Sequence, residues 1–143
     1  MKLALAGLLI ATSAALAACG SDKPAAPASA SPTAYTWAQF AAEYQTVLAT
    51  TCDDSNQQKW VLCLGTQSIG VESMSRAAAS LPAGKGRADL QGVLDNWKQD
   101  YSEFQRSRCE GSAATSDITC IGKRATLPTR FSTIQAIVKR ENR

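Results

Sequence analysis

The sequence predicts an all-α domain, a four-helix antiparallel bundle made of two duplicated helical hairpins, each closed by a disulfide. Apolar residues recur at helical spacing in four stretches, and no convincing strand alternation is present. Four cysteines form two pairs with identical internal spacing, and the chain matches itself when it is shifted by 57 residues. Four helices joined by short turns favour antiparallel packing in a bundle.

Residues 1–18 have the pattern of a secretory signal. Lys2 supplies a positive charge, and residues 3–18 are apolar apart from Thr12 and Ser13. This stretch is shorter than the about 20 residues that a membrane-spanning helix needs. We therefore expect a cleaved signal peptide here.

The end of this leader carries a more specific pattern. The run Leu16-Ala17-Ala18-Cys19 resembles the lipobox of bacterial lipoproteins, and the resemblance covers residues 1–19 only. It implies cleavage before Cys19 and attachment of a diacylglyceryl group to the Cys19 thiol, which would anchor the protein on the extracytoplasmic face of a bacterial membrane. Gly20 does not match the inner-membrane retention signal, so an outer membrane is the expected location in a host that has one. The alternative is an ordinary secretory signal, which leaves Cys19 as a free thiol.

The lipidated Cys19 is expected to begin a disordered linker that ends at residue 34. Three of the five prolines fall in this segment, which is otherwise rich in alanine and serine. Such a composition cannot bury an apolar face, and it gives a partly extended tether. The remaining residues, 35–143, are enough for one helical domain with a modest core.

Four apolar stripes define the helices of this domain. In chain order they comprise Trp37, Phe40, Ala41, Tyr44, Val47 and Leu48; Leu64, Val71, Met74, Ala78 and Leu81; Leu90, Val93, Leu94, Trp97, Tyr101 and Phe104; and Phe131, Ile134, Ile137 and Val138. Thr36 is the expected cap of the first helix. Pro82 ends the second, Gly84-Lys85-Gly86 is the expected turn, and the fourth begins near Thr126 or Pro128.

The 57-residue shift superimposes cysteines, glycines and core positions together. Cys52 and Cys63 fall on Cys109 and Cys120, and the aromatic stripe of the first helix falls on that of the third. We interpret this as two copies of one unit, repeat 1 at about 35–82 and repeat 2 at about 88–141. The two cysteine segments should then lie at the same end of the bundle. Pro128 falls on Val71, which predicts a kinked or restarted helix in the second copy.

The repeat favours the pairings Cys52–Cys63 and Cys109–Cys120 among the three that four cysteines allow. Each bridge closes about a dozen residues, which stabilises the fold by roughly 3 kcal/mol in the chain-entropy model. A four-cysteine metal site is the alternative, but zinc sites usually use tighter Cys-x2-Cys pairs, and exported thiols tend to oxidise.

The sequence offers no catalytic residue, metal ligand set or cofactor motif. Histidine is absent, which removes the commonest general base and metal ligand. The stretch from Gly65 to Gly70 has one residue too many for a nucleophile elbow, and these glycines more plainly indicate a helix break or a close helix contact. Fourteen basic and twelve acidic side chains remain without Lys2, a balance that does not indicate nucleic-acid binding. We therefore expect no enzymatic activity.

Basic residues and one tryptophan are the candidates for partner binding. Arg106, Arg108, Lys123 and Arg124 flank the second cysteine segment, with Arg130 as a possible extension, and could meet an anionic envelope component or an acidic protein. The alternative is a solvated face. Trp60 lies between the first two cysteines, either packed over their disulfide or exposed as an anchor for a partner.

The function predicted from these features is that of a membrane-anchored extracytoplasmic lipoprotein, which acts as a non-enzymatic interaction or envelope-accessory module. The alternative is a carrier or sensor of a small apolar ligand between the hairpins, in a cavity lined by Trp37, Tyr44, Trp97 and Tyr101. The partner, the host envelope type and the oligomeric state are left open by the sequence.

Overall fold

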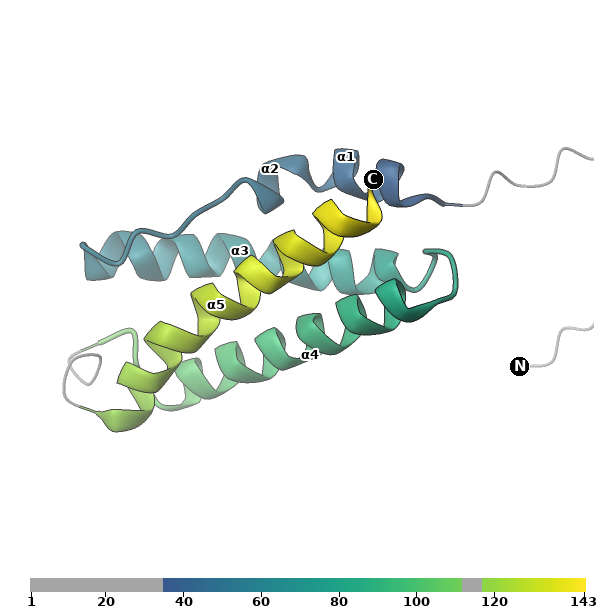
Figure 1. Cartoon of the computed structure of the whole chain (residues 1–143). Helices are drawn as coiled ribbons and strands as arrows, with labels where there is room; N and C mark the ends of the chain where they lie inside the picture. Colours follow the sequence, from purple (N-terminus) through teal and green to yellow (C-terminus); the bar gives the residue numbers. More distant parts are fainter. Residues whose placement is uncertain (1–34, 112–116) are drawn as a thin grey trace, which may run out of the picture. The chain divides into compact units, whose positions relative to one another are not determined.

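The computed structural model describes residues 35–111 and 117–143. All regular elements within these ranges are helices, which confirms the all-α class (Figure 1). In chain order they are α1 (Trp37–Glu43), α2 (Gln45–Leu48), α3 (Gln57–Ala78), α4 (Lys85–Arg106) and α5 (Ile118–Glu141). The expected signal, the lipidation site Cys19 and the linker lie outside the described residues. None of the described helices is long and apolar enough to cross a membrane.

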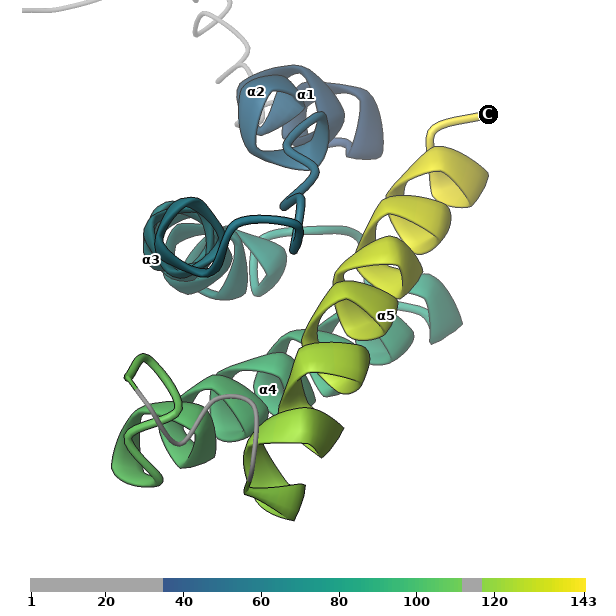
Figure 2. The ribbon, with the colours of Figure 1, turned by 90° about the vertical axis from the view of Figure 1, so that its left-hand side faces the viewer.

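The long helices α3 and α4 run in opposite directions and are joined by the short turn at residues 79–84 (Figure 1). Helix α5 packs along α4, and its C-terminal part reaches α1. Figure 2 shows α1 and α4 on opposite sides of α3, with α5 crossing obliquely beside them. The core between these helices contains buried side chains from all four predicted stripes.

The first predicted helix is divided at Tyr44 into α1 and α2. As predicted, Thr36 caps α1, and Gln39 completes a capping box with it. At the division the Tyr44 ring packs 4.8 Å from that of Phe40, and its hydroxyl lies 3.0 Å from Ser73 Oγ of α3. The segment therefore follows α3 in two short helices instead of one straight helix.

Helices α3 and α5 both begin earlier than predicted. Asn56 caps α3 by accepting a hydrogen bond from the Lys59 amide, which places the start of this helix between the first two cysteines. Asp117 caps α5 by accepting from the amides of Thr119 and Cys120. The prediction of a start near Thr126 or Pro128 was therefore wrong.

Pro128 lies inside α5, and the helix neither ends nor restarts there. A proline within a helix removes one backbone hydrogen bond, the one to the carbonyl four residues earlier. Packing on both sides of the proline compensates for this loss, because Leu127 and Phe131 are buried in the core. Tertiary packing here outweighs a local signal for a helix start.

The structure contains the two disulfides that the repeat favours. Cys52 is bonded to Cys63 and Cys109 to Cys120, with Cα–Cα distances of 5.6 and 5.2 Å. In each pair the second cysteine lies on a helix, α3 or α5, so the bridge ties the preceding segment to the first turns of that helix.

Gly70 provides a close helix contact, whereas the alternative of a helix break is wrong because α3 is continuous. A Cβ added at Gly70 would lie 2.4 Å from Cγ1 of Val47, so α2 packs against the bare backbone of α3 at this point. A side chain at position 70 would therefore overlap with Val47 and push the short helix α2 away from α3.

We expect Gly70→Ala to lower the free energy of unfolding by about 1–2 kcal/mol, because overpacking against Val47 exceeds the gain in helix propensity. The matched control is Gly92→Ala in α4, where an added Cβ would meet nothing within 4 Å. That variant should be stabilised by up to about 1 kcal/mol. Urea denaturation of both variants measures the difference, and two equal shifts would contradict the close contact.

Candidate functional site

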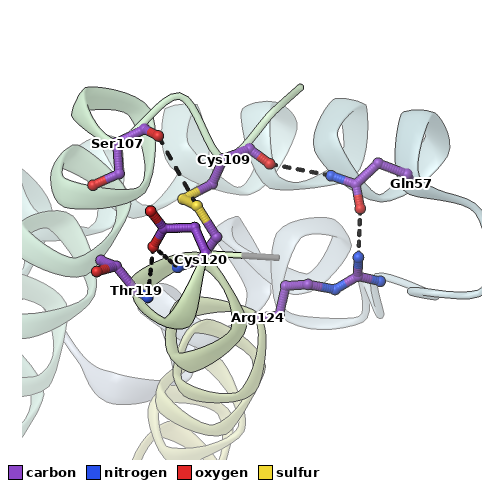
Figure 3. The surroundings of a disulfide bond; sticks show 7 residues. Gln57, Ser107, Cys109, Thr119, Cys120 and Arg124 are labelled. Atoms are coloured by element: carbon purple, nitrogen blue, oxygen red, sulfur yellow. Dashed lines mark hydrogen bonds between the residues drawn. A yellow bond between two sulfur atoms is a disulfide. The ribbon is translucent and has the colours of Figure 1, made fainter. Parts of the chain in front are cut away.

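The two disulfide-closed segments lie at the same end of the domain and contact each other (Figure 1). We call this region the cysteine end; it comprises residues 49–63, 104–111 and 117–124. The Gln57 side-chain amide donates a hydrogen bond of 3.2 Å to the carbonyl of Cys109, which joins the first segment to the second (Figure 3).

Arg124 strengthens this junction from α5. Its guanidinium donates to Gln57 Oε1 at 2.6 Å and to the backbone carbonyl of Asp54 at 3.0 Å. Figure 3 shows Arg124 and Gln57 meeting beside the Cys109–Cys120 bridge. Arg124 is therefore engaged within the protein, which is a different role from the predicted exposed partner contact.

Trp60 is fully buried, so the prediction of an exposed partner anchor is wrong. Its ring packs edge-on against Phe104 of α4 at 5.4 Å, and the Arg124 guanidinium carbon lies 5.1 Å from the ring centroid. A guanidinium over an indole ring at this distance forms a cation–π contact. Trp60 thus joins α3, α4 and α5.

Lys123 and Arg130, two cations of the predicted basic patch, form a charge cluster with acidic residues between α4 and α5. Asp100 is only 6 % exposed and accepts hydrogen bonds from Lys123 and Arg130. Lys123 also pairs with Glu103. Lys123 and Arg130 therefore neutralise a nearly buried carboxylate and its neighbour, and the predicted extension of a free basic patch to Arg130 is wrong.

The cluster shifts the pKa values of its members in complementary directions. Burial alone would raise the pKa of Asp100, but the hydrogen bonds from Lys123 and Arg130 outweigh it and hold this pKa below its ordinary value. The hydrogen bond from Lys123 likewise lowers the pKa of Glu103. Hydrogen bonds to Asp100 and Glu103 raise the pKa of Lys123. All three groups are thus charged at neutral pH, as a structural ion-pair cluster requires.

Arg106 and Arg108 are the two predicted partner-binding cations whose side chains are exposed. Arg108 has a φ of 54°, the left-handed conformation that glycine adopts most easily. The amides of Arg108 and Cys109 donate to the carbonyls of Gln105 and Phe104, which closes the end of α4 in a Schellman motif. This motif directs the chain from α4 into the Cys109–Cys120 bridge and fixes the position of Arg108 beside it.

Large aliphatic side chains are exposed near the same bridge, and sequence reasoning missed them. Ile118 is 83 % and Ile121 48 % exposed, both in the first turn of α5 that the bridge holds at Cys120. The signal available in the sequence was the position of these isoleucines on either side of Cys120. Leu62 and Ile69 are similarly exposed on α3.

The four aromatics proposed to line a ligand cavity fall into two groups. Trp37 and Tyr44 contact Phe40 beside α1, whereas Trp97 stacks on Tyr101 in α4 at 5.2 Å. Tyr44 and Trp97 belong to the same buried core, and Trp37 and Tyr101 pack against it. An open groove between α3 and α4 is lined by Trp97 and Tyr101 together with polar residues such as Ser68 and Lys98.

The described residues contain no group of three or more His, Cys, Asp or Glu side chains that could hold a metal ion. The four cysteines that the metal alternative would require are bonded in disulfides.

Comparisons of the chain with protein-family models, curated proteins and solved structures found no match.

Proposed function

We propose that this protein is a membrane-anchored extracytoplasmic lipoprotein whose helical domain is a non-enzymatic interaction or envelope-accessory module. The anchor would be a diacylglyceryl group on Cys19, as the lipobox-like run before it implies. The two disulfides support an oxidising compartment, because such bonds are rare in proteins that stay in the cytosol.

We also propose that the domain is an antiparallel four-helix bundle of two duplicated hairpins, in which α1 and α2 together correspond to α4, and α3 corresponds to α5. The support is matched burial at the 57-residue spacing. Phe40 and Trp97 are both buried, as are Met74 and Phe131. Both bridges also join cysteines that are 11 residues apart. The correspondence weakens at the start of α5, where exposed Ile121 falls on buried Leu64.

The observation that favours a binding role is the exposed surface around the Cys109–Cys120 bridge. It consists of Arg106, Arg108, Ile118 and Ile121, and we call it the bridge surface. Two exposed cations and two exposed isoleucines lie beside a disulfide that fixes the positions of their chain segments. Fixed positions lower the entropy that binding would cost. A partner that combines acidic groups with an apolar area fits this surface.

The bridge surface can be tested by photocrosslinking in intact cells of the host. A photoreactive amino acid at Ile118 should give a crosslinked product that is lost when Arg106→Glu and Arg108→Glu are introduced together. The positional control is the same probe at Ala136, exposed farther along α5. The charge control is Lys85→Glu with Lys139→Glu, two exposed cations away from the cysteine end.

The expected result is crosslinking from position 118 that depends on Arg106 and Arg108 and survives the charge control. Equal products from positions 118 and 136, or an unchanged product in the double arginine variant, would assign the interaction to another surface. Circular dichroism of each variant shows whether the helical fold is retained.

A further inference from the structure

The two disulfides close segments of the same length but differ in access to solvent. Cys109 and Cys120 are both fully buried, and the sulfur of Cys120 lies 4.0 Å from the carbonyl oxygen of Ser107 (Figure 3). Cys52 and Cys63 both keep part of their surface exposed. The residues of the first bridge are therefore closer to solvent than those of the second, which are shielded by packed side chains.

A small pocket lies beside the first bridge, between residues 50–52 and helices α3 and α5. Cys52 lies in its wall, and its cavity volume is about 100 Å³. Pro128, Phe131, Ser132 and Gln135 form the side that belongs to α5. A pocket of this size admits a small molecule or a single side chain.

The lining of this pocket carries no charged side chain. Besides the residues of α5 it consists of Thr50, Thr51, Cys52 and Gln67. Asp53 follows Cys52 in the chain, but its carboxylate accepts hydrogen bonds from the amide and hydroxyl of Ser55. These hydrogen bonds lower the pKa of Asp53, which keeps its charge, but neither Asp53 nor the exposed Asp54 belongs to the pocket lining.

Non-covalent contacts hold the segment before Cys52 independently of the disulfide. The Gln67 side-chain amide donates to the Thr50 carbonyl at 3.2 Å, and that of Gln135 donates to the Leu48 carbonyl at 2.6 Å. On the other side of Cys52, Arg124 binds the carbonyl of Asp54. Opening of the bridge would thus leave both neighbouring stretches of chain attached to α3 and α5.

We propose that Cys52–Cys63 is a thiol–disulfide exchange site, and that Cys109–Cys120 is a structural bridge that does not exchange in the folded protein. The co-reactant is a dithiol, either a small molecule or an exposed pair of cysteines on a redox protein. Its thiolate attacks one sulfur of the bridge, forms a mixed disulfide and releases the other sulfur, which takes up a proton. Its second thiolate then attacks the first sulfur of the dithiol within the mixed disulfide and breaks the bond to the protein. The released protein sulfur takes up a proton, so that the dithiol is oxidised to a disulfide and Cys52 and Cys63 become thiols.

The test is native-state reduction of the full-length protein by dithiothreitol, with iodoacetamide quenching at intervals and peptide mapping by mass spectrometry. We expect Cys52 and Cys63 to be alkylated at least tenfold faster than Cys109 and Cys120. The far-ultraviolet circular dichroism spectrum should change little during the first phase. Equal rates for the two bridges, faster reduction of Cys109–Cys120, or no reduction of either without denaturant would each overturn the proposal.

Two variants test the pocket as the route. Ser132→Trp places a large side chain in the pocket wall and should slow reduction of Cys52–Cys63 by at least threefold. Thr133→Trp is the matched control, because this neighbouring exposed position on α5 belongs to a different groove. The same rate for both variants would show that the pocket is not the path of the reductant and would overturn that part of the proposal.

Discussion

Replacing Cys109 and Cys120 together by alanine is expected to lower the free energy of unfolding by about 3–5 kcal/mol. The bridge closes a segment with a sequence separation of 11, and its loss restores roughly 3 kcal/mol of chain entropy to the unfolded state. Both sulfurs are also fully buried, so their removal leaves space in the core. Urea denaturation of the full-length protein measures the effect.

The double variant Cys52→Ala with Cys63→Ala is the matched control. Its bridge has the same sequence separation, so the entropy that it contributes is similar. Cys52 and Cys63 are only partly buried, and the additional packing loss should therefore be smaller. A loss below about 1 kcal/mol for the Cys109 and Cys120 variant would contradict the structural role of that bridge, since native disulfides in small domains typically contribute about 2–5 kcal/mol.

Trp60→Ala is expected to destabilise the protein by about 3–5 kcal/mol, the usual cost of truncating a fully buried tryptophan. The variant removes the ring that contacts Phe104 and Arg124, and with it a junction of three helices. The native stability of a domain is typically about 5–15 kcal/mol, so this loss is a large share. Thermal and urea unfolding provide the measurement.

Trp60→Phe separates ring packing from the indole N–H group. This N–H has no hydrogen-bond partner within the described part of the chain, so its removal carries no loss of a protein hydrogen bond. Phenylalanine keeps an aromatic ring at the site, and the expected loss is less than half of that for alanine. Unchanged stability in Trp60→Ala would contradict the burial of this side chain and return it to the role of an exposed anchor.

The position of Trp60 shows that the helical periodicity of α3 begins one turn before the predicted stripe. Trp60 stands four residues before Leu64, and the series continues through buried Gln67, Val71 and Met74 at helical spacing. The stripe predicted from the sequence begins at Leu64, because residues 52–63 are expected to form a loop closed by a disulfide. Asn56 caps a helix inside that segment, and a helix that starts there places Trp60 on the buried face.

The charge cluster illustrates the opposite case, in which the sequence alone was insufficient. Asp100 lies 23 residues before Lys123 and 30 before Arg130, so no local pattern links these groups. They meet because α5 begins at Ile118 and packs along α4. If the helix started near Thr126 or Pro128, Lys123 would lie outside it. For that reason the sequence predicts Lys123 to be part of a free basic surface.

The disulfide pairing was accessible because it depends on spacing and repetition, which the sequence contains directly. The difference in burial between the two bridges was not accessible. It arises where α3, α4 and α5 meet, with Phe104 and Trp60 packed in the same core as Cys109 and Cys120. Any contrast in reactivity between the bridges is therefore a property of the folded protein.

The central proposal, a lipid-anchored extracytoplasmic protein stapled by two disulfides, is tested most directly by mass spectrometry of the protein extracted from host membranes without reductant. The proposal predicts a mature chain that begins at Cys19 and carries a diacylglyceryl group, together with disulfide-linked peptides Cys52–Cys63 and Cys109–Cys120. A chain that retains residues 1–18, or one with an unmodified Cys19 and four free thiols, would contradict it.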